Sequence, residues 1–227
     1  MTMDYTIVRH PKRRRLSLQI TSERELKVLA PLGVSVRKIT QFVSKQEDWI
    51  LQTLEKIPVL DKPQFQNGET FLYLGDRYPL VLQRGAQTEL TLNKGCLYLH
   101  CDEIAFHSID KKADMLEKWY RLRAKDIIVD RVEIYAEQMG LRPNQIRIKG
   151  HRSRWGSCSN KGNLNFNWRL ILTPIEVLDY VVVHELAHLV HMNHSASFWQ
   201  LVAVHCPEYK AHKKWLKIHA GSLFTLG

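Results

Sequence analysis

His184-Glu185-Leu186-Ala187-His188 is the stretch that most narrows the choice of fold for this chain of 227 residues. Two histidines four residues apart on an α-helix point to the same side, because one turn of the helix takes about 3.6 residues. Their imidazole rings can therefore bind one metal ion together. The glutamate between them lies beside this face rather than on it, so it can reach the surroundings of the ion without being a ligand.

A helix is expected to begin just before this stretch, near Thr173. Thr173 suits the N-cap, Pro174 suits the first helical position, and Glu176 follows the cap by three residues. These three residues together form a helix-start signature. We therefore expect the metal motif on a helix rather than in a loop.

The histidines lie on one face of this expected helix. His188 falls at about 40° and His191 at about 340° from His184, away from the main apolar stripe. Asn193 can adopt the left-handed conformation that ends a helix, and Ser195 can cap a new one. We therefore expect the helix to end at Asn193.

Three residues compete to be the third protein ligand of a catalytic zinc ion, which usually has three such ligands and one water. His194 stands at a chain reversal six residues after His188, from where it can swing back to the ion. Glu208 has the spacing of the glutamate ligand in some zinc peptidases. It directly follows Pro207 at an expected helix start, however, where an acidic residue complements the helix dipole. We favour His194 and keep Glu208 and His191 as alternatives.

Glu185 is the expected general base. A bound zinc ion lowers the pKa of its water toward about 7, and a carboxylate beside the ion can take the proton and later return it to the leaving group. The stretch therefore predicts a zinc-dependent hydrolase.

The rest of the chain predicts an α+β fold in two parts. Residues 1–107 form a β-rich part with one helix, and residues 108–227 form a mainly helical metal-binding domain with a short sheet. We place this boundary before a long amphipathic helix that begins at Ser108 or Asp110 and stops before Gly140. In the first part we expect a hairpin over residues 16–20 and 25–30, a helix over 35–57 and short strands between 68 and 99. In the second part we expect strands over 146–149 and 163–172, and helices over 195–204 and 207–220.

The charge balance is strongly basic, with a formal net charge of +10 and a pI of about 9.5. An excess of Lys and Arg favours polyanionic partners such as nucleic acid or nucleotides. The densest run, Lys12-Arg13-Arg14-Arg15, leads into an alternating strand, which sends neighbouring arginines to opposite faces. We therefore favour a solvated strand entrance over a nucleic-acid patch.

The sequence shows neither a signal peptide nor a membrane span. Its first five residues have no apolar core, and no stretch approaches the roughly 18 continuous apolar residues of a membrane helix. The four cysteines have irregular spacings and no Cys-x-x-Cys pair, so they suggest neither a disulfide framework nor a zinc ribbon. We expect a cytoplasmic protein that does not contact a membrane.

Several further motifs accompany the metal stretch. They are Arg154-Trp155-Gly156-Ser157-Cys158-Ser159, Gly162-Asn163-Leu164, Asn167-Trp168-Arg169-Leu170, Asp179-Tyr180-Val181-Val182, Asn193-His194-Ser195 and Phe198-Trp199, with Arg13 to Leu18 and Ala30-Pro31 near the N-terminus. Read together, they make the chain resemble the YgjP-like metallopeptidase family, a relative of the SprT-like and WLM zincin proteases. The resemblance implies a zincin-like α+β domain with His184, His188 and His194 as metal ligands and Glu185 as the catalytic residue.

The substrate is less closely defined than the chemistry, because some members of this family are described as nucleotide pyrophosphatases that act on UTP. Our first hypothesis is a zinc peptidase, and the alternative converts UTP to UMP and diphosphate at the same metal. Arg154 and Arg169 are candidate substrate-binding residues, since a guanidinium can hold a carboxylate or a phosphate through two hydrogen bonds. A third hypothesis is a nucleic-acid-binding module with a structural metal. A strand edge beside the site would favour peptides, a cleft rich in Arg and Lys would favour nucleotides, and four protein ligands would favour a structural metal.

Overall fold

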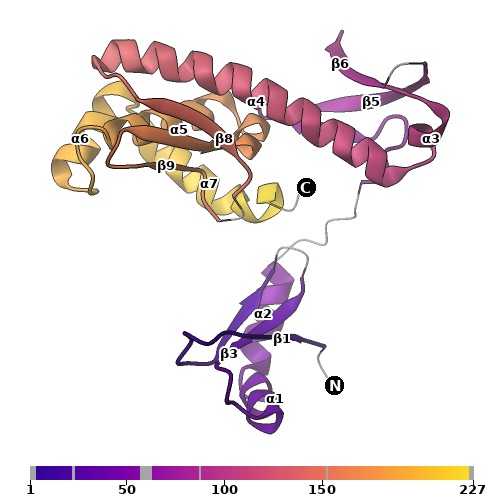
Figure 1. The fold of residues 1–227 in the computed structure, drawn as a ribbon, viewed down its shortest axis with the longest axis vertical. Coiled ribbons are helices and arrows are strands. Elements are labelled where there is room, and N and C mark those ends of the chain that lie inside the picture. The colour runs from indigo at the N-terminus through magenta and orange to yellow at the C-terminus, as the bar shows by residue number, and fades with distance from the viewer. Residues whose placement is uncertain (1–3, 22–23, 57–62, 87, 152, 225–227) are drawn as a thin grey trace. The chain divides into compact units, whose positions relative to one another are not determined.

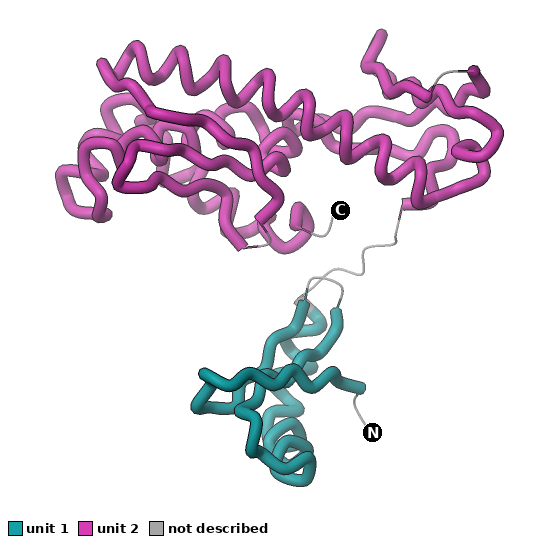
Figure 2. Tube along the Cα trace, in the orientation of Figure 1, with its two compact units in different colours: residues 1–62, 226 teal, residues 63–225, 227 magenta. Residues whose placement is uncertain are grey.

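The computed structural model describes residues 4–21, 24–56, 63–86, 88–151 and 153–224, and it confirms the α+β class (Figure 1). Contacts divide the chain into two compact units, and the division falls between residues 62 and 63 (Figure 2). The expected boundary between residues 107 and 108 differs from this division. No helix among the described residues has both the length and the apolar character needed to cross a membrane.

The first unit is a small sheet packed against two helices. Its elements are β1 (Thr6–Arg9), β2 (Ser17–Ile20), β3 (Leu26–Ala30), α1 (Val36–Ser44) and α2 (Glu47–Lys56). The strand order is β1-β3-β2, and β2 pairs antiparallel with β3, which confirms the expected hairpin. The core consists of Leu26, Val28, Ala30, Ile39, Val43 and Ile50.

Two helices stand where we expected one helix over residues 35–57. The Gln46 N–H donates to the Val43 carbonyl (2.9 Å), a tight turn that ends α1. The acidic pair Glu47 and Asp48 then opens α2, where negative charge complements the helix dipole. The expectation of a continuous helix was therefore wrong.

In its described residues the second unit contains two sheets and the remaining helices. Its strands are β4 (Thr70–Tyr73), β5 (Asp76–Arg84), β6 (Glu89–Asn93), β7 (Cys96–Cys101), β8 (Gln145–Lys149), β9 (Gly156–Cys158) and β10 (Asn163–Asn167). Its helices are α3 (Glu103–Phe106), α4 (Ile109–Met139), the 3₁₀ helix η1 (Trp168–Leu172), α5 (Ile175–Ala187), α6 (Ala196–His205) and α7 (Tyr209–Phe224). The sheets have the orders β4-β5-β7-β6 and β8-β10-β9.

Helix α4 runs along both sheets of this unit and explains why they belong together (Figure 1). Every fourth residue from Lys112 to Ala136 is buried, which makes one continuous packing stripe. The Tyr120 hydroxyl donates to the Leu72 carbonyl, and the Leu74 N–H donates to the Ile171 carbonyl (2.7 Å). Residues 63–107 are thus joined to α4 and η1, so contacts group them with the rest of the second unit.

The side chain of Arg131 on α4 clamps α5. Its Nε donates to Asp179 Oδ1 (2.6 Å), its second contact reaches Asp179 Oδ2, and the Tyr135 hydroxyl donates to the same carboxylate (3.2 Å). Asp179 is 7% exposed, so it depends on these partners in place of water. The clamp holds the helix that carries the metal motif.

Replacing Arg131 with methionine is expected to lower the free energy of unfolding by about 2 kcal/mol, because it leaves a buried carboxylate without its cation. Chemical denaturation measures this loss. The matched control on the same helix is Arg123→Met, whose ion pair with Asp126 is exposed on both sides, and whose loss costs at most about 1 kcal/mol. Equal losses in the two variants would contradict a clamping role for Arg131.

Candidate metal centre

The segment that leads into α5 differs from the predicted one. We predicted a strand over residues 163–172, but β10 ends at Asn167 and a 3₁₀ helix follows. An apolar run of this length fits a strand or a buried helix equally well by its pattern alone. The Asn167 side chain decides between them, because its Oδ1 accepts from the Arg169 N–H (3.2 Å) and caps the new turn.

We predicted that Thr173 caps α5, and this prediction was wrong. Its hydroxyl donates to the Leu170 carbonyl (2.8 Å) and so closes the preceding η1 turn. Pro174 takes the N-cap position of α5 without a side-chain cap. The buried Thr173 thus satisfies its hydroxyl behind the helix rather than at its start.

Helix α5 ends earlier than expected. The last helical residue is Ala187, and His188 is the C-cap with a right-handed conformation. The Leu189 N–H donates to Leu186 and the Val190 N–H to Ala187, bonds three residues back that tighten the chain into a turn. Asn193 has no positive φ, so the left-handed stop that we expected there was wrong. His191 therefore lies outside the helix.

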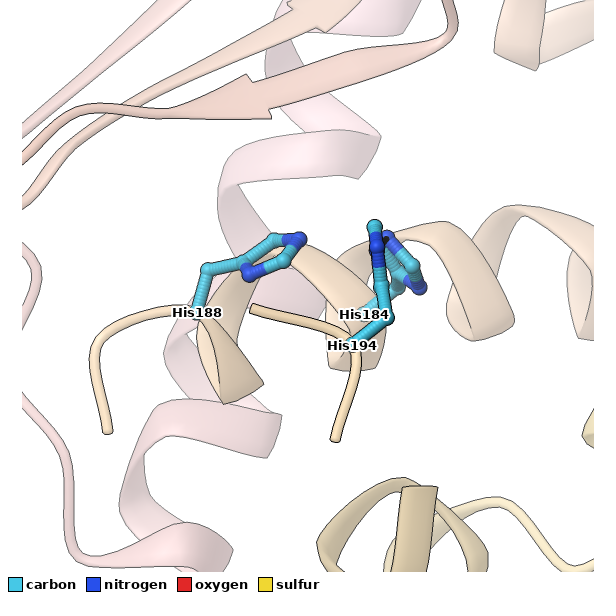
Figure 3. A group of neighbouring side chains, drawn as sticks. All are labelled: His184, His188 and His194. Carbon is cyan, nitrogen blue, oxygen red and sulfur yellow. Dashed lines mark hydrogen bonds between the residues drawn. The ribbon is translucent and has the colours of Figure 1, made fainter. Parts of the chain in front are cut away.

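The structure brings His184, His188 and His194 together (Figure 3). One nitrogen from each ring lies within 4.8 Å of the other two. The rings of His184 and His194 lie side by side, and that of His188 lies across from them (Figure 3). His194 comes from the loop before α6, and Ser195 caps that helix by accepting from the Phe198 N–H (3.3 Å), as expected. The cap fixes the place where the chain turns back.

Two of the nitrogens have the separation of neighbouring ligands on one tetrahedral zinc ion, and the third lies within 4.8 Å of them. The Nε2 atoms of His184 and His194 are 3.1 Å apart, and two nitrogens bound at about 2.0–2.1 Å from zinc are separated by about 3.3 Å. His188 Nδ1 donates to the His191 carbonyl (3.0 Å), which leaves its Nε2 as the lone-pair nitrogen. Three neutral imidazoles are a donor set that suits zinc.

The surroundings of His184 and His194 favour the neutral form of both rings. Burial, and then the nearby His188 and His194, lowers the pKa of His184 to about 3. Burial also lowers the pKa of His194. The neutral imidazole is the form that binds metal, so the lowered pKa values of His184 and His194 favour metal binding.

Glu185 follows His184 on α5, and its side chain is buried. It is 5% exposed, and burial raises its pKa to about 8. Its Oε2 and the Nδ1 of His184 have no hydrogen-bond partner in the described part of the chain. Such orphaned buried atoms are uncommon in proteins and mark places where a further group belongs.

Aromatic residues form one wall of the centre. The Phe198 ring is fully buried, and its centroid lies 5.0, 4.6 and 4.8 Å from those of His184, His188 and His194. Trp199 stacks on His194 at 5.5 Å, and Lys213 places its ammonium 4.3 Å from the Trp199 ring centroid. The sequence did not predict a place for Phe198 and Trp199 beside the metal.

The remaining candidates have other surroundings. Glu208 is exposed near the start of α7, and His191 contributes its carbonyl to His188; neither belongs to the group of three. The Arg154 side chain is exposed, while the buried Arg169 guanidinium stacks over Trp168 at 4.4 Å. A role for either arginine in substrate binding stays a prediction.

Comparison with known proteins gives one family. A family model described as the YgjP-like metallopeptidase domain matches residues 14–219. No match was found among curated proteins. Among solved structures, the crystal structure of the metallopeptidase zymogen of Pyrococcus abyssi abylysin is similar, with 23% sequence identity, coverage of 40% of this chain and 92% of that chain, and a TM-score of 0.35. Because the family model spans most of the chain, this protein belongs to the YgjP-like metallopeptidase family and is a metal-dependent hydrolase.

Proposed function

We propose that this protein is a zinc-dependent peptidase with a zincin-like catalytic domain. His184, His188 and His194 hold the ion, and Glu185 acts as general base. One observation carries the proposal: three imidazole nitrogens converge within 4.8 Å, and the residue that follows His184 on α5 is a buried glutamate. This is the arrangement that metal-assisted hydrolysis requires.

Each residue of the centre has a distinct part in the reaction. When bound, zinc supplies Lewis acidity and makes water a nucleophile near neutral pH. In its ionised form Glu185 accepts the proton of the attacking water at its carboxylate and returns it to the nitrogen of the leaving amine. The Phe198 and Trp199 rings limit access of solvent, which strengthens the electrostatic interactions within the site.

The number of ligands supports a catalytic rather than a structural metal. Among the described residues, the group of His, Cys, Asp and Glu side chains that converge here has three members. Three protein ligands leave one coordination position for water or substrate, whereas structural zinc sites are usually closed by four. The proposal of a catalytic ion follows from this difference.

The sheet beside α5 favours a peptide over a nucleotide. β9 is the outer strand in the order β8-β10-β9, and it packs against α5. An outer strand can pair with an extended peptide, which is a common way for proteins to bind peptides. The UTP alternative lacks a comparable observation, since Arg169 stacks on Trp168 in the core.

Removal and return of zinc test the proposal. We expect chelated protein to lose turnover of a peptide library and to regain it with one equivalent of zinc, because the three histidines cannot activate water without the ion. Mass spectrometry of the products measures the cleavage, and a nucleotide panel that includes UTP is assayed in parallel. Zinc-dependent turnover of UTP without peptide cleavage would favour the nucleotide pyrophosphatase. If neither substrate is turned over, the proposal that this protein is a zinc-dependent hydrolase is rejected.

A further inference from the structure

Gly156, the first residue of β9, lies against the side chain of Glu185. A Cβ atom built on Gly156 would stand 2.5 Å from Glu185 Oε1, 2.7 Å from its Cγ and 2.8 Å from its Cδ. Carbon atoms do not approach a carboxylate oxygen so closely without a bond. No side chain larger than hydrogen therefore fits at position 156 while Glu185 keeps its place.

The three nearest atoms all belong to the side chain of Glu185, and none belongs to the backbone. Both backbones nearby are held firmly. Gly156 is paired with Phe166 of β10, and the Asn167 N–H donates to the adjacent Trp155 carbonyl (2.7 Å). On the helix side, Leu186 and Ala187 are fully buried. A methyl group at position 156 would therefore displace the carboxylate rather than the strand or the helix.

Packing against Gly156 contributes to the position of this carboxylate. The described residues give Glu185 Oε2 no hydrogen-bond partner, although the atom is buried. Because no hydrogen bond holds Oε2, the direction of the side chain depends in part on which space is open. The open space is the one left by the missing side chain at Gly156.

We propose that Gly156 is a positioning residue, whose missing side chain creates the space that holds the Glu185 carboxylate beside the three histidines. The inference rests on the proposed function, since it matters for catalysis only if Glu185 is the base. It gives a physical role to the Arg154-Trp155-Gly156-Ser157 segment that precedes the metal helix.

Gly156→Ala tests the effect on catalysis in the full-length, zinc-loaded protein. We expect kcat for a cleaved peptide to fall about 100-fold, as a misplacement of about 1 Å can do. Zinc content and KM stay unchanged, because the contacts at position 156 involve the base and not the histidines. The control is Gly221→Ala on α7, where an added Cβ meets nothing within 4 Å, and where kcat stays within twofold. A kcat for Gly156→Ala within twofold of the parent overturns the proposal.

A thermal-melting cycle tests the contact without any activity. Glu185→Ala removes all three atoms that the new Cβ would meet. We expect Gly156→Ala to lower Tm in the parent protein and to leave Tm unchanged in the Glu185→Ala background. An equal Tm shift in both backgrounds would place the cost in the strand and overturn the proposal. If no peptide is cleaved by the parent, the proposed function fails, and this cycle still decides whether Gly156 sets the place of Glu185.

Discussion

Replacement of Glu185 by glutamine is expected to lower kcat of the zinc-loaded protein by a factor of about 10² to 10⁴, the usual contribution of a general base. Glutamine has nearly the shape of glutamate, but its amide does not accept a proton at neutral pH. Glu185 is not one of the three grouped metal donors, so we expect one zinc per chain to remain. Peptide cleavage kinetics and metal analysis of the same sample measure both results.

Glu208→Gln is the matched control for this substitution. It makes the same chemical change at an exposed carboxylate near the start of α7, outside the group of three histidines. We expect its kcat to equal that of the parent within experimental scatter. A Glu185→Gln protein that binds zinc and keeps its turnover would remove Glu185 from the mechanism.

Elements with local signals in the sequence could be predicted well. Ser108 caps α4 by accepting from the Lys111 N–H, and Gly140 ends it in the left-handed conformation at φ 63°, both as expected. These signals are local, because a cap or a stop needs only residues within one turn. The helices over residues 195–204 and 207–220 were found for the same reason.

Elements that depend on distant partners could not be predicted. β1 was missed because its pairing is parallel to β3, about twenty residues away along the chain, and its own pattern is weak. The pattern of apolar residues from Trp168 to Leu172 fits a strand and a buried helix equally well. The Asn167 side chain favours the helix by capping its first turn. Thr173 has the composition of a cap, but burial gives its hydroxyl another partner.

In the candidate site too, contacts between residues close in sequence could be predicted, and a contact between distant residues could not. The spacing of His184 and His188 places two rings together from the sequence alone, and the turn before Ser195 brings in His194. The contact between Gly156 and Glu185 joins a strand to a helix and leaves no trace in local spacing. Only the three-dimensional structure shows that a glycine in the motif before α5 faces the expected base.

Removal of the His194 ring is expected to weaken zinc binding more than about 100-fold. Loss of a residue that only hydrogen-bonds to a metal ligand already lowers metal affinity about 10- to 100-fold. His194→Ala leaves two nitrogens, both on the C-terminal turn of α5. Two ligands do not define a tetrahedral site, so we expect little zinc after dialysis and no peptide cleavage. Metal analysis and titration with a competing chelator measure the loss.

Glu208→Ala and His191→Ala distinguish this ligand set from the two alternatives. Both proteins are expected to keep one zinc per chain, since neither side chain belongs to the converging group. His191→Ala is the sharper control, because its contact with His188 is made by the backbone carbonyl, which alanine retains. Zinc retained by His194→Ala, or lost from Glu208→Ala, would reject the assignment. If His191→Ala alone loses the metal, the His191 ring is the third ligand. The turn after α5 must then rearrange when zinc binds.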